Sequence, residues 1–147
     1  PENKCGPRAL KTFKLTNLQR PIDYIVNDFE IRTDVVIDRT TSRSWQKGGS
    51  PYPLNWQEAH GYISTLNKIQ FGGLNTWRLP TLDELLSLLN DSPEQTGMFF
   101  DLHRKWLWSC DLHGKTERWF INLDMGYVAS QDMDCPNYVK AVSSEVG

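Results

Sequence analysis

The segment Trp77-Arg78-Leu79-Pro80-Thr81, with the leucine-rich run that follows it, constrains the fold more than any other part of the chain. Thr81 and Glu84 have the spacing of a capping box, in which two side chains accept hydrogen bonds from each other's backbone N–H groups. Pro80 disfavours helical geometry at the residue before it, so the predicted helix has a sharp start. Leucines then recur every three or four residues and give the helix one apolar face. The sequence therefore predicts an amphipathic helix over residues 81–90, with four structural residues at its start: Trp77, Arg78, Thr81 and Glu84.

Arg78 is the residue of this junction that capping and apolar packing do not explain. A guanidinium group carries five N–H donors and needs acceptors close by. We expect Arg78 to pair with an acid from the β-rich last third of the chain or with buried backbone carbonyls. Either partner would make Arg78 a structural residue.

The composition is that of an ordinary globular protein. At 147 residues the chain fits one domain with a substantial core. The net charge of −2 gives no basic surface of the kind that binds nucleic acid. No stretch approaches the roughly 20 apolar residues of a membrane span. We therefore expect neither a nucleic-acid partner nor a membrane-spanning segment.

Helical and strand patterns divide the chain into an arm and one domain. Residues 1–22 are mildly basic, and we expect an extended N-terminal arm that lies on the domain formed by residues 23–147. A second capping pair, Asn55 and Glu58, begins an amphipathic helix over residues 55–68. Short strand patterns occupy residues 29–32, 35–37, 43–46, 106–110, 117–123, 126–130 and 138–143. This order predicts the α+β class with small antiparallel sheets.

A series of short motifs follows in order between about residues 34 and 143. They are Asp38 to Trp45, Asn55-Trp56-Gln57-Glu58-Ala59, Gly72-Gly73, Trp77–Leu85, Trp108-Ser109, Trp119–Leu123 with Gly126, and Tyr138–Val142. The series resembles the Lcl C-terminal domain family, named for a bacterial collagen-like adhesin. The chain departs from the family pattern at Ser42-Arg43, where Gly-Leu is usual, and at Lys140, where Arg is expected.

This resemblance implies a C-type-lectin-like fold, akin to that of formylglycine-generating-enzyme domains, with variable loops on a small sheet. Such domains usually serve as recognition modules on bacterial surfaces, in the periplasm or on phage particles. We therefore expect an extracellular, cell-surface or periplasmic location. The family has no shared catalytic set that could be transferred to this chain. The resemblance thus implies a non-enzymatic adhesion domain that binds a glycan or a protein on a cell surface.

Aromatic side chains are the candidates for ligand binding, because exposed rings stack on sugar faces or anchor protein interfaces. We expect the contacts to come from the loops over residues 46–54, 91–105 and 111–136, since such scaffolds carry function on loops. Four residues are the ligand-binding candidates: Tyr52, Trp106, Trp119 and Tyr127.

Two patterns in the sequence point to metal binding, both more weakly than the aromatic residues point to ligand binding. Asp124, Asp132 and Asp134 could supply the oxygen ligands that calcium prefers, but the sugar-binding triplet of calcium-dependent lectins is missing. His103, Cys110, His113 and Cys135 could in principle converge on zinc, although a second closely spaced ligand pair is absent. We expect no cofactor, with calcium as the open alternative.

The three cysteines leave the redox state open. Cys110 and Cys135 would close a loop of about 25 residues, which a disulfide would stabilise by about 3 kcal/mol. Cys5 would then be left over. Both a Cys110–Cys135 disulfide and three reduced thiols are consistent with the sequence.

Two further function classes stay open. The chain could be a structural subunit of a surface or phage assembly, with the basic arm docking on a neighbour in a homo-oligomer. A metal- or thiol-dependent enzyme would have to use Cys110, His113 and Cys135. A hydrolase of the Ser-His-Asp kind is disfavoured because the chain contains no Gly-x-Ser-x-Gly motif.

Overall fold

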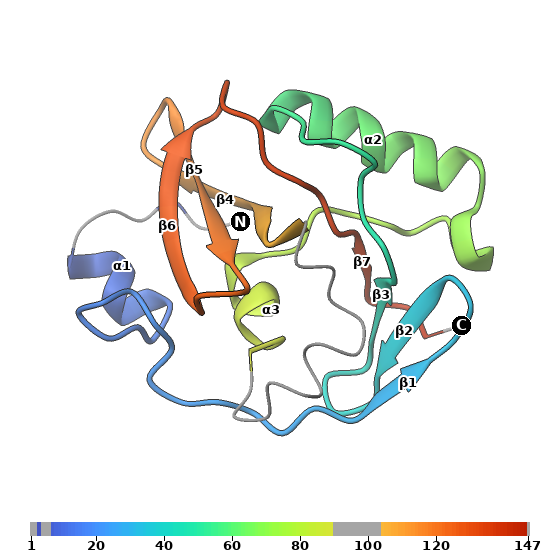
Figure 1. Ribbon diagram of the computed structural model, residues 1–147, viewed down its shortest axis with the longest axis horizontal. Coiled ribbons are helices and arrows are strands. Elements are labelled where there is room, and N and C mark those ends of the chain that lie inside the picture. Colours follow the sequence, from blue (N-terminus) through green and yellow to red (C-terminus); the bar gives the residue numbers. More distant parts are fainter. Residues whose placement is uncertain (1–2, 4–6, 90–103, 147) are drawn as a thin grey trace.

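Two small antiparallel sheets organise the computed structural model, which describes residue 3 and residues 7–89 and 104–146 (Figure 1). The first sheet has the strand order β1-β2-β3-β7. Its members are β1 (Phe29–Ile31), β2 (Val35–Asp38), β3 (Arg43–Gln46) and β7 (Val142–Ser143). The last strand therefore returns from the far end of the chain and pairs with β3, with Trp45 opposite Val142. The predicted strands of this region are confirmed, although β7 is shorter than the predicted segment 138–143.

The second sheet is the predicted meander, formed by β4 (Trp106–His113), β5 (Glu117–Asn122) and β6 (Tyr127–Asp132). The register of β4 against β5 shifts between Trp108 and Leu112, which marks a bulge. Gly126 has a φ of 73° in the turn between β5 and β6, a conformation that favours glycine. Together the two sheets and the few helices make this an α+β domain, as predicted.

The first predicted helix is confirmed as α2 (Trp56–Lys68). Asn55 and Glu58 form the capping box in both directions, because each side chain accepts a hydrogen bond from the other residue's backbone N–H. The helix buries Ala59, Ile63 and Leu66, and a short 3-10 turn, η1 (Phe71–Gly73), follows it. None of the described helices is both long and apolar enough to cross a membrane.

The second predicted helix begins at the predicted place but is shorter than predicted. Helix α3 spans Leu82–Leu86, with Thr81 as the N-cap and Glu84 completing the capping box. The expected helix over 81–90 stops at Ser87, whose hydroxyl donates to the Glu84 carbonyl at 2.5 Å. The next two residues, Leu88 and Leu89, continue with tighter i→i+3 bonds. Residue 90 lies outside the described residues.

The N-terminal arm is not extended throughout, which corrects the prediction for residues 1–22. Residues Pro7–Thr12 form helix α1. Ala9, Phe13 and Leu15 are buried in the core, and the ring of Phe13 packs edge-on against Trp119 with centroids 5.5 Å apart. Apolar burial therefore folds this segment into the domain, although its sequence shows no strong helical pattern. The domain boundary at residue 22 stays a prediction.

The core consists of two clusters on opposite faces of the second sheet. Leu107, Ile121 and Val128 are cross-strand neighbours on one face and pack with α1, α3 and part of the first sheet. Trp108 and Phe120 lie on the other face, in the cluster that includes the buried side of α2. The meander is thus buried on both faces near its centre, which leaves its ends and loops as exposed surface.

Candidate functional site

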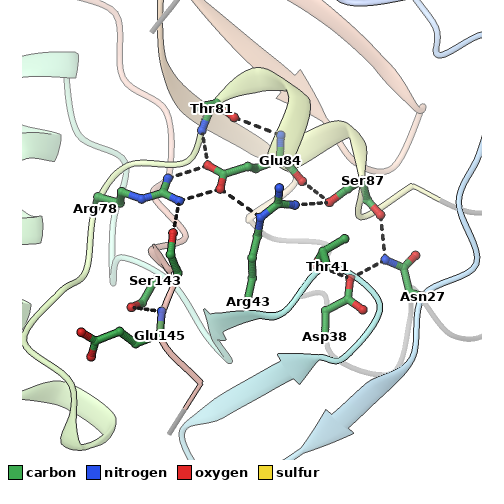
Figure 2. A network of polar contacts seen from close by, with 11 residues as sticks. Asn27, Asp38, Thr41, Arg43, Arg78, Thr81, Glu84, Ser87, Ser143 and Glu145 are labelled. Carbon is green, nitrogen blue, oxygen red and sulfur yellow. Dashed lines mark hydrogen bonds and ion pairs between the residues drawn. The ribbon is translucent and has the colours of Figure 1, made fainter.

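Glu84 is the centre of a polar network that joins α3 to the first sheet (Figure 2). Its carboxylate accepts two hydrogen bonds from the Arg78 guanidinium, each 2.6 Å long. Arg43 of β3 adds an ion pair at 3.1 Å, and the backbone N–H of Thr81 donates to Oε1 at 2.8 Å. An ionised carboxylate offers about four acceptor sites. Donors of the protein itself therefore fill the acceptor sites of Glu84.

The network holds Glu84 in its ionised form. Burial alone would raise the pKa of this carboxyl group, but the hydrogen bonds from Arg78 and Thr81 and the charge of Arg43 outweigh burial. The pKa of Glu84 therefore lies below its ordinary value of 4.5. A general acid or base that works near neutral pH needs the opposite shift, so the network is structural.

Arg78 is paired differently from the expectation drawn from the sequence. Its partner Glu84 lies only six residues further along the chain, and no acid of the described meander pairs with it. A further hydrogen bond of 2.8 Å runs from Nη2 to the Ser144 hydroxyl. The capping box explains the difference, because it turns the Glu84 carboxylate back toward the strand-like end that carries Arg78.

The same network continues to the turn after β2. The Asn27 side-chain amide donates to the Ser87 carbonyl at 2.8 Å and to Asp38 Oδ2 at 2.7 Å. Thr41 donates its hydroxyl hydrogen to the same Asp38 oxygen at 3.0 Å. Figure 2 shows these groups side by side at the end of α3. The Asp38 turn is therefore a structural corner.

Lys140 forms a second buried polar anchor, which sequence reasoning missed. Its ammonium group donates to the carbonyls of Gln46 and Lys47, each at 2.9 Å, and to the carbonyl of Gly48. The residue is 2% exposed, so it ties the segment before β7 to the loop after β3. An ammonium group has three donors and no acceptor, which suits this cluster of carbonyls. The Lys at this position, where the resemblance led us to expect Arg, is thus compatible with the fold.

The meander brings two predicted ligand contacts together at one end. Trp106 of β4 and Tyr127 of β6 lie on either side of Asn122 of β5 in the strand register. Directly paired residues of antiparallel strands point to the same face, so the two rings flank one amide. Trp106 is 40% exposed and Tyr127 is partly buried. We call Trp106, Asn122 and Tyr127 the aromatic end.

Charged groups border the aromatic end. The Lys105 ammonium lies 4.7 Å from the centroid of the Trp106 ring, a cation–π contact. The same ammonium group is 3.8 Å from Asp124 in the turn between β5 and β6. Met125 of that turn is 55% exposed. The sequence gives no signal for Asn122 or Lys105, because their roles depend on the register of three strands.

The other two aromatic candidates lie elsewhere. Trp119 is 2% exposed and packs edge-on against both Phe13 and His113. It is a core residue, so its prediction as a ligand contact was wrong. Tyr52 is 62% exposed in the loop before α2, which keeps it accessible, but it makes no contact with the aromatic end among the described interactions. The predicted binding loop over 91–105 lies mostly outside the described residues.

The three aspartates proposed for calcium do not form one site. Asp124 precedes β6, while Asp132 is its last residue and Asp134 follows. A strand of this length spans about 17 Å, whereas calcium ligands lie about 2.3–2.6 Å from the ion. Asp132 instead accepts a hydrogen bond from the backbone N–H of Asp134. Within residues 7–89 and 104–146, no group of three His, Cys, Asp or Glu residues could hold a metal ion.

Cys110 and Cys135 are free thiols in the structure, which thus shows the reduced one of the two alternatives that the sequence left open for this pair. Cys110 lies on β4 and packs against the second core cluster, whereas Cys135 lies in the turn after β6. Strand β5 separates β4 from β6 in the sheet. Burial, with a smaller contribution from the neighbouring Asp111, raises the pKa of the Cys110 thiol to about 11. Such a thiol is a poor nucleophile and a poor thiolate ligand; His103, the remaining candidate for zinc, lies outside the described residues.

Comparison with known families gives a match that covers most of the chain. The model of the Lcl C-terminal domain matches residues 34–143. This range contains the second sheet, the first sheet without β1, both α2 and α3, the ion pairs of Glu84 with Arg43 and Arg78, and the aromatic end. A search of curated proteins finds no match. The matched range begins after α1 and β1, so those elements precede the shared region. From this match, the chain belongs to the Lcl C-terminal domain family.

Proposed function

We propose that this domain is a non-enzymatic recognition and adhesion module that binds a cell-surface glycan through its aromatic end. The proposal includes a C-type-lectin-like scaffold, a link to collagen-like adhesins, and a place on a bacterial surface, in the periplasm or on a phage particle. Membership of the Lcl C-terminal domain family is consistent with a surface-associated domain. The ligand, the location and the finer fold type go beyond that membership.

The observation that carries the proposal is the placement of Trp106 and Tyr127 on either side of Asn122. Aromatic rings provide apolar faces for the C–H groups of a sugar. Asn122 between them is 3% exposed and its side-chain oxygen accepts a hydrogen bond from the Met125 N–H at 2.9 Å, so this amide fixes the turn beside the rings. Lys105 and Asp124 add a donor and an acceptor at the border. Such a surface combines flat apolar contact with directional polar contact, as glycan recognition requires.

Two features support a non-enzymatic role. The buried carboxylate of Glu84 is occupied by its own arginines, and burial suppresses the reactivity of the Cys110 thiol. The thiol-dependent alternative would need an activated cysteine next to a base. His113, the histidine nearest to Cys110 in sequence, packs against Trp119 and lies 3.9 Å from Glu117.

A glycan array with the whole 147-residue chain tests the proposal. We expect Trp106→Ala and Tyr127→Ala to weaken binding of the array hits by about tenfold each, because one stacked ring contributes on the order of 1 kcal/mol or more. Ile69→Ala is the matched control, since Ile69 is exposed just after α2. Chelation of divalent ions should leave binding unchanged. An array without hits, or hits that both ring variants retain at full strength, would contradict glycan binding.

A protein ligand is the other outcome of this experiment. Exposed aromatic side chains also anchor protein interfaces, so an empty array followed by capture of one host protein, lost in Trp106→Ala, would assign the same surface to a protein. The structural-subunit alternative has its own observation, a row of exposed apolar residues in the segment Leu18–Val26. Deleting residues 1–20 is no clean test of that role, because Phe13 and Leu15 belong to the core.

A further inference from the structure

Arg118 of β5 is a partly buried cation that the fold does not pair with an acid. Its Nη1 group donates to two backbone carbonyls at the turn between β4 and β5, that of Lys115 at 3.3 Å and that of Glu117 at 2.7 Å. Among the residues that the structure describes, no carboxylate forms an ion pair with Arg118. Arg43 and Arg78, by contrast, share the Glu84 carboxylate.

The side edge of the Arg118 guanidinium group also lacks a hydrogen-bond acceptor. Its Nε atom is buried and has no partner, and Nη2 makes no hydrogen bond within the described part of the chain. Nε–H and one Nη2–H point in the same direction, which is the fork that the two oxygens of a carboxylate can bridge. A buried donor without a partner is rare in native proteins, and an acceptor from a ligand would satisfy this one.

Gln131 adds further donors beside this edge. It is the direct partner of Arg118 across β5 and β6, so the two side chains lie on one face of the sheet. Its side-chain oxygen accepts a hydrogen bond from the Asn137 amide at 2.7 Å. The NH2 group of Gln131 is the part that makes no hydrogen bond to the described residues. The free groups of Arg118 and Gln131 are thus all donors, which suits an anion.

Two apolar side chains border these donors. The Cζ atom of Arg118 lies 4.4 Å from the centroid of the Trp56 ring, a cation–π contact, and Leu112 is the partner of Arg118 on β4. Trp56 and Leu112 are both partly buried. The indole of Trp56 is fixed in turn, because its Nε1 donates to the Ser109 carbonyl at 2.9 Å and its ring meets His60 edge-on.

We propose that Arg118 and Gln131 bind the carboxylate group of a small organic acid that carries a short apolar tail. One carboxylate oxygen accepts from Nη2 of Arg118 and the other from the deeper Nε, and the Gln131 amide is the third donor. The tail lies against Leu112 and Trp56. A planar carboxylate matches the side edge of a guanidinium group in shape, and its single negative charge matches the charge of Arg118.

His60 senses the charge of this site. Burial lowers the pKa of its imidazole, and the positive charge of Arg118 lowers this pKa further. His60 is therefore uncharged at neutral pH, and Arg118 carries the positive charge beside Trp56. A bound carboxylate offsets the charge of Arg118, so it should raise the pKa of His60.

An NMR titration of the full chain with sodium butyrate, at constant ionic strength, tests the site. We expect the Nε–H resonance of Arg118 to shift with a dissociation constant of about 1–10 mM, and the pKa of His60 to rise as the site fills. Butyramide has the same shape without the charge and should cause no shift. Sulfate should bind at least tenfold more weakly. No saturable shift up to about 100 mM butyrate, or equal binding of butyramide or sulfate, would overturn the proposal.

Gln131→Glu supplies a carboxylate from within the chain. Glu retains an acceptor for the Asn137 amide and places a negative charge next to Arg118, so this variant should remain folded. We expect it to bind butyrate at least tenfold more weakly than the wild type, because its own carboxylate occupies the donors. Wild-type butyrate affinity in a folded Gln131→Glu variant would contradict the proposed site.

Arg118→Lys removes the side edge and keeps the charge. We expect butyrate binding, followed at the Trp56 Nε1–H resonance, to weaken at least tenfold in this variant. Arg39→Lys is the matched control, because Arg39 is an exposed arginine that pairs with Glu30. It should bind butyrate as the wild type does. Equal binding by the two variants would show that the guanidinium edge of Arg118 is not the binding group.

This site is separate from the aromatic end and does not rest on the proposed glycan binding. Arg118 and Asn122 lie four residues apart on β5, which corresponds to about 13 Å. Trp106→Ala should lose glycan binding and keep wild-type butyrate affinity, and Arg118→Lys should keep the glycan hits. The butyrate titration has the same expected result whether or not the glycan array yields hits. Loss of butyrate binding in a Trp106→Ala variant that is folded by circular dichroism would contradict the placement of the site.

Discussion

Arg78 contributes to stability chiefly through its two hydrogen bonds to the Glu84 carboxylate. Replacing it by Ala leaves the buried Glu84 with Arg43 and a backbone N–H only. Losing one partner of a buried pair costs up to about 3–5 kcal/mol, and the Arg78 side chain is 39% exposed. We therefore expect Arg78→Ala to lower the free energy of unfolding by about 2 kcal/mol in urea titrations.

The control for this change is an exposed arginine of the same type. Arg39 pairs with Glu30 at the surface, and Arg39→Ala should change stability by less than about 0.5 kcal/mol. Ligand binding at the aromatic end should persist in Arg78→Ala at temperatures where the variant is folded. Unchanged stability together with lost binding would show that Arg78 belongs to the ligand site.

Glu84 also gives the domain a pH dependence at the residue scale. Its pKa in the folded protein is below the ordinary value of 4.5, so the unfolded chain binds its proton first as the pH falls. The stability from this group is fully present above about pH 4.5 and is lost as the pH falls through the lower folded value. We expect the free energy of unfolding to drop over this range in the wild type, and to drop less in Glu84→Gln. Equal slopes in both proteins would contradict this assignment.

At the scale of the element, α1 is part of the domain. Phe13, just after α1, is 3% exposed and contacts Trp119. We expect Phe13→Ala to cost about 3–4 kcal/mol, the usual range for a buried phenylalanine, measured by thermal and urea unfolding. Leu18→Ala is the matched control in the same arm, because Leu18 is 75% exposed. Similar small losses in both variants would indicate an arm that is not packed on the core.

Local sequence rules predict the start of each main helix and fail at the end of one. Capping boxes need only residues three apart, so Asn55 and Thr81 were found from the sequence. The end of α3 depends on Ser87, whose carbonyl is held by Asn27 from a distant segment. The apolar pattern of the leucines continues to Leu89, and the pattern alone therefore predicted a longer helix.

Contacts between distant segments decided what the sequence could not. From the sequence alone, Trp119 is as good a candidate for a ligand contact as the other aromatic residues. In the structure Phe13, just after α1, packs against its ring. Trp106 and Tyr127 were candidates as single rings, but only the register of β4, β5 and β6 places them around Asn122. The spacing of Cys110 and Cys135 in the sequence is compatible with a disulfide. In the structure β5 lies between β4, which carries Cys110, and β6, which precedes Cys135, and both thiols are free.

At the scale of the whole molecule, Lys140 joins segments more than 90 residues apart in the sequence. We expect Lys140→Met to lower the free energy of unfolding by about 3 kcal/mol, because it leaves three carbonyls without their charged donor. The loop after β3 should also become more sensitive to proteolysis. Lys68→Met, at the exposed end of α2, is the control and should change stability by less than about 0.5 kcal/mol. A stable, protease-resistant Lys140→Met variant would show that the ammonium group is dispensable.

Strand β7 has a consequence for how the chain is made. Its two residues, Val142 and Ser143, pair with β3, and the Val142 backbone also bonds Arg78 on its other side. A growing polypeptide emerges from the ribosome with its amino end first, so β3 and the Arg78 segment lack this neighbour until residues 142 and 143 have been synthesised, almost 100 residues after β3. Native closure of the first sheet must therefore follow the emergence of β7 from the ribosome. In a nascent chain that stalls before residue 142, β3 and the Arg78 segment both lack β7 as their neighbour. Their unpaired backbone groups would then be open to incorrect pairing.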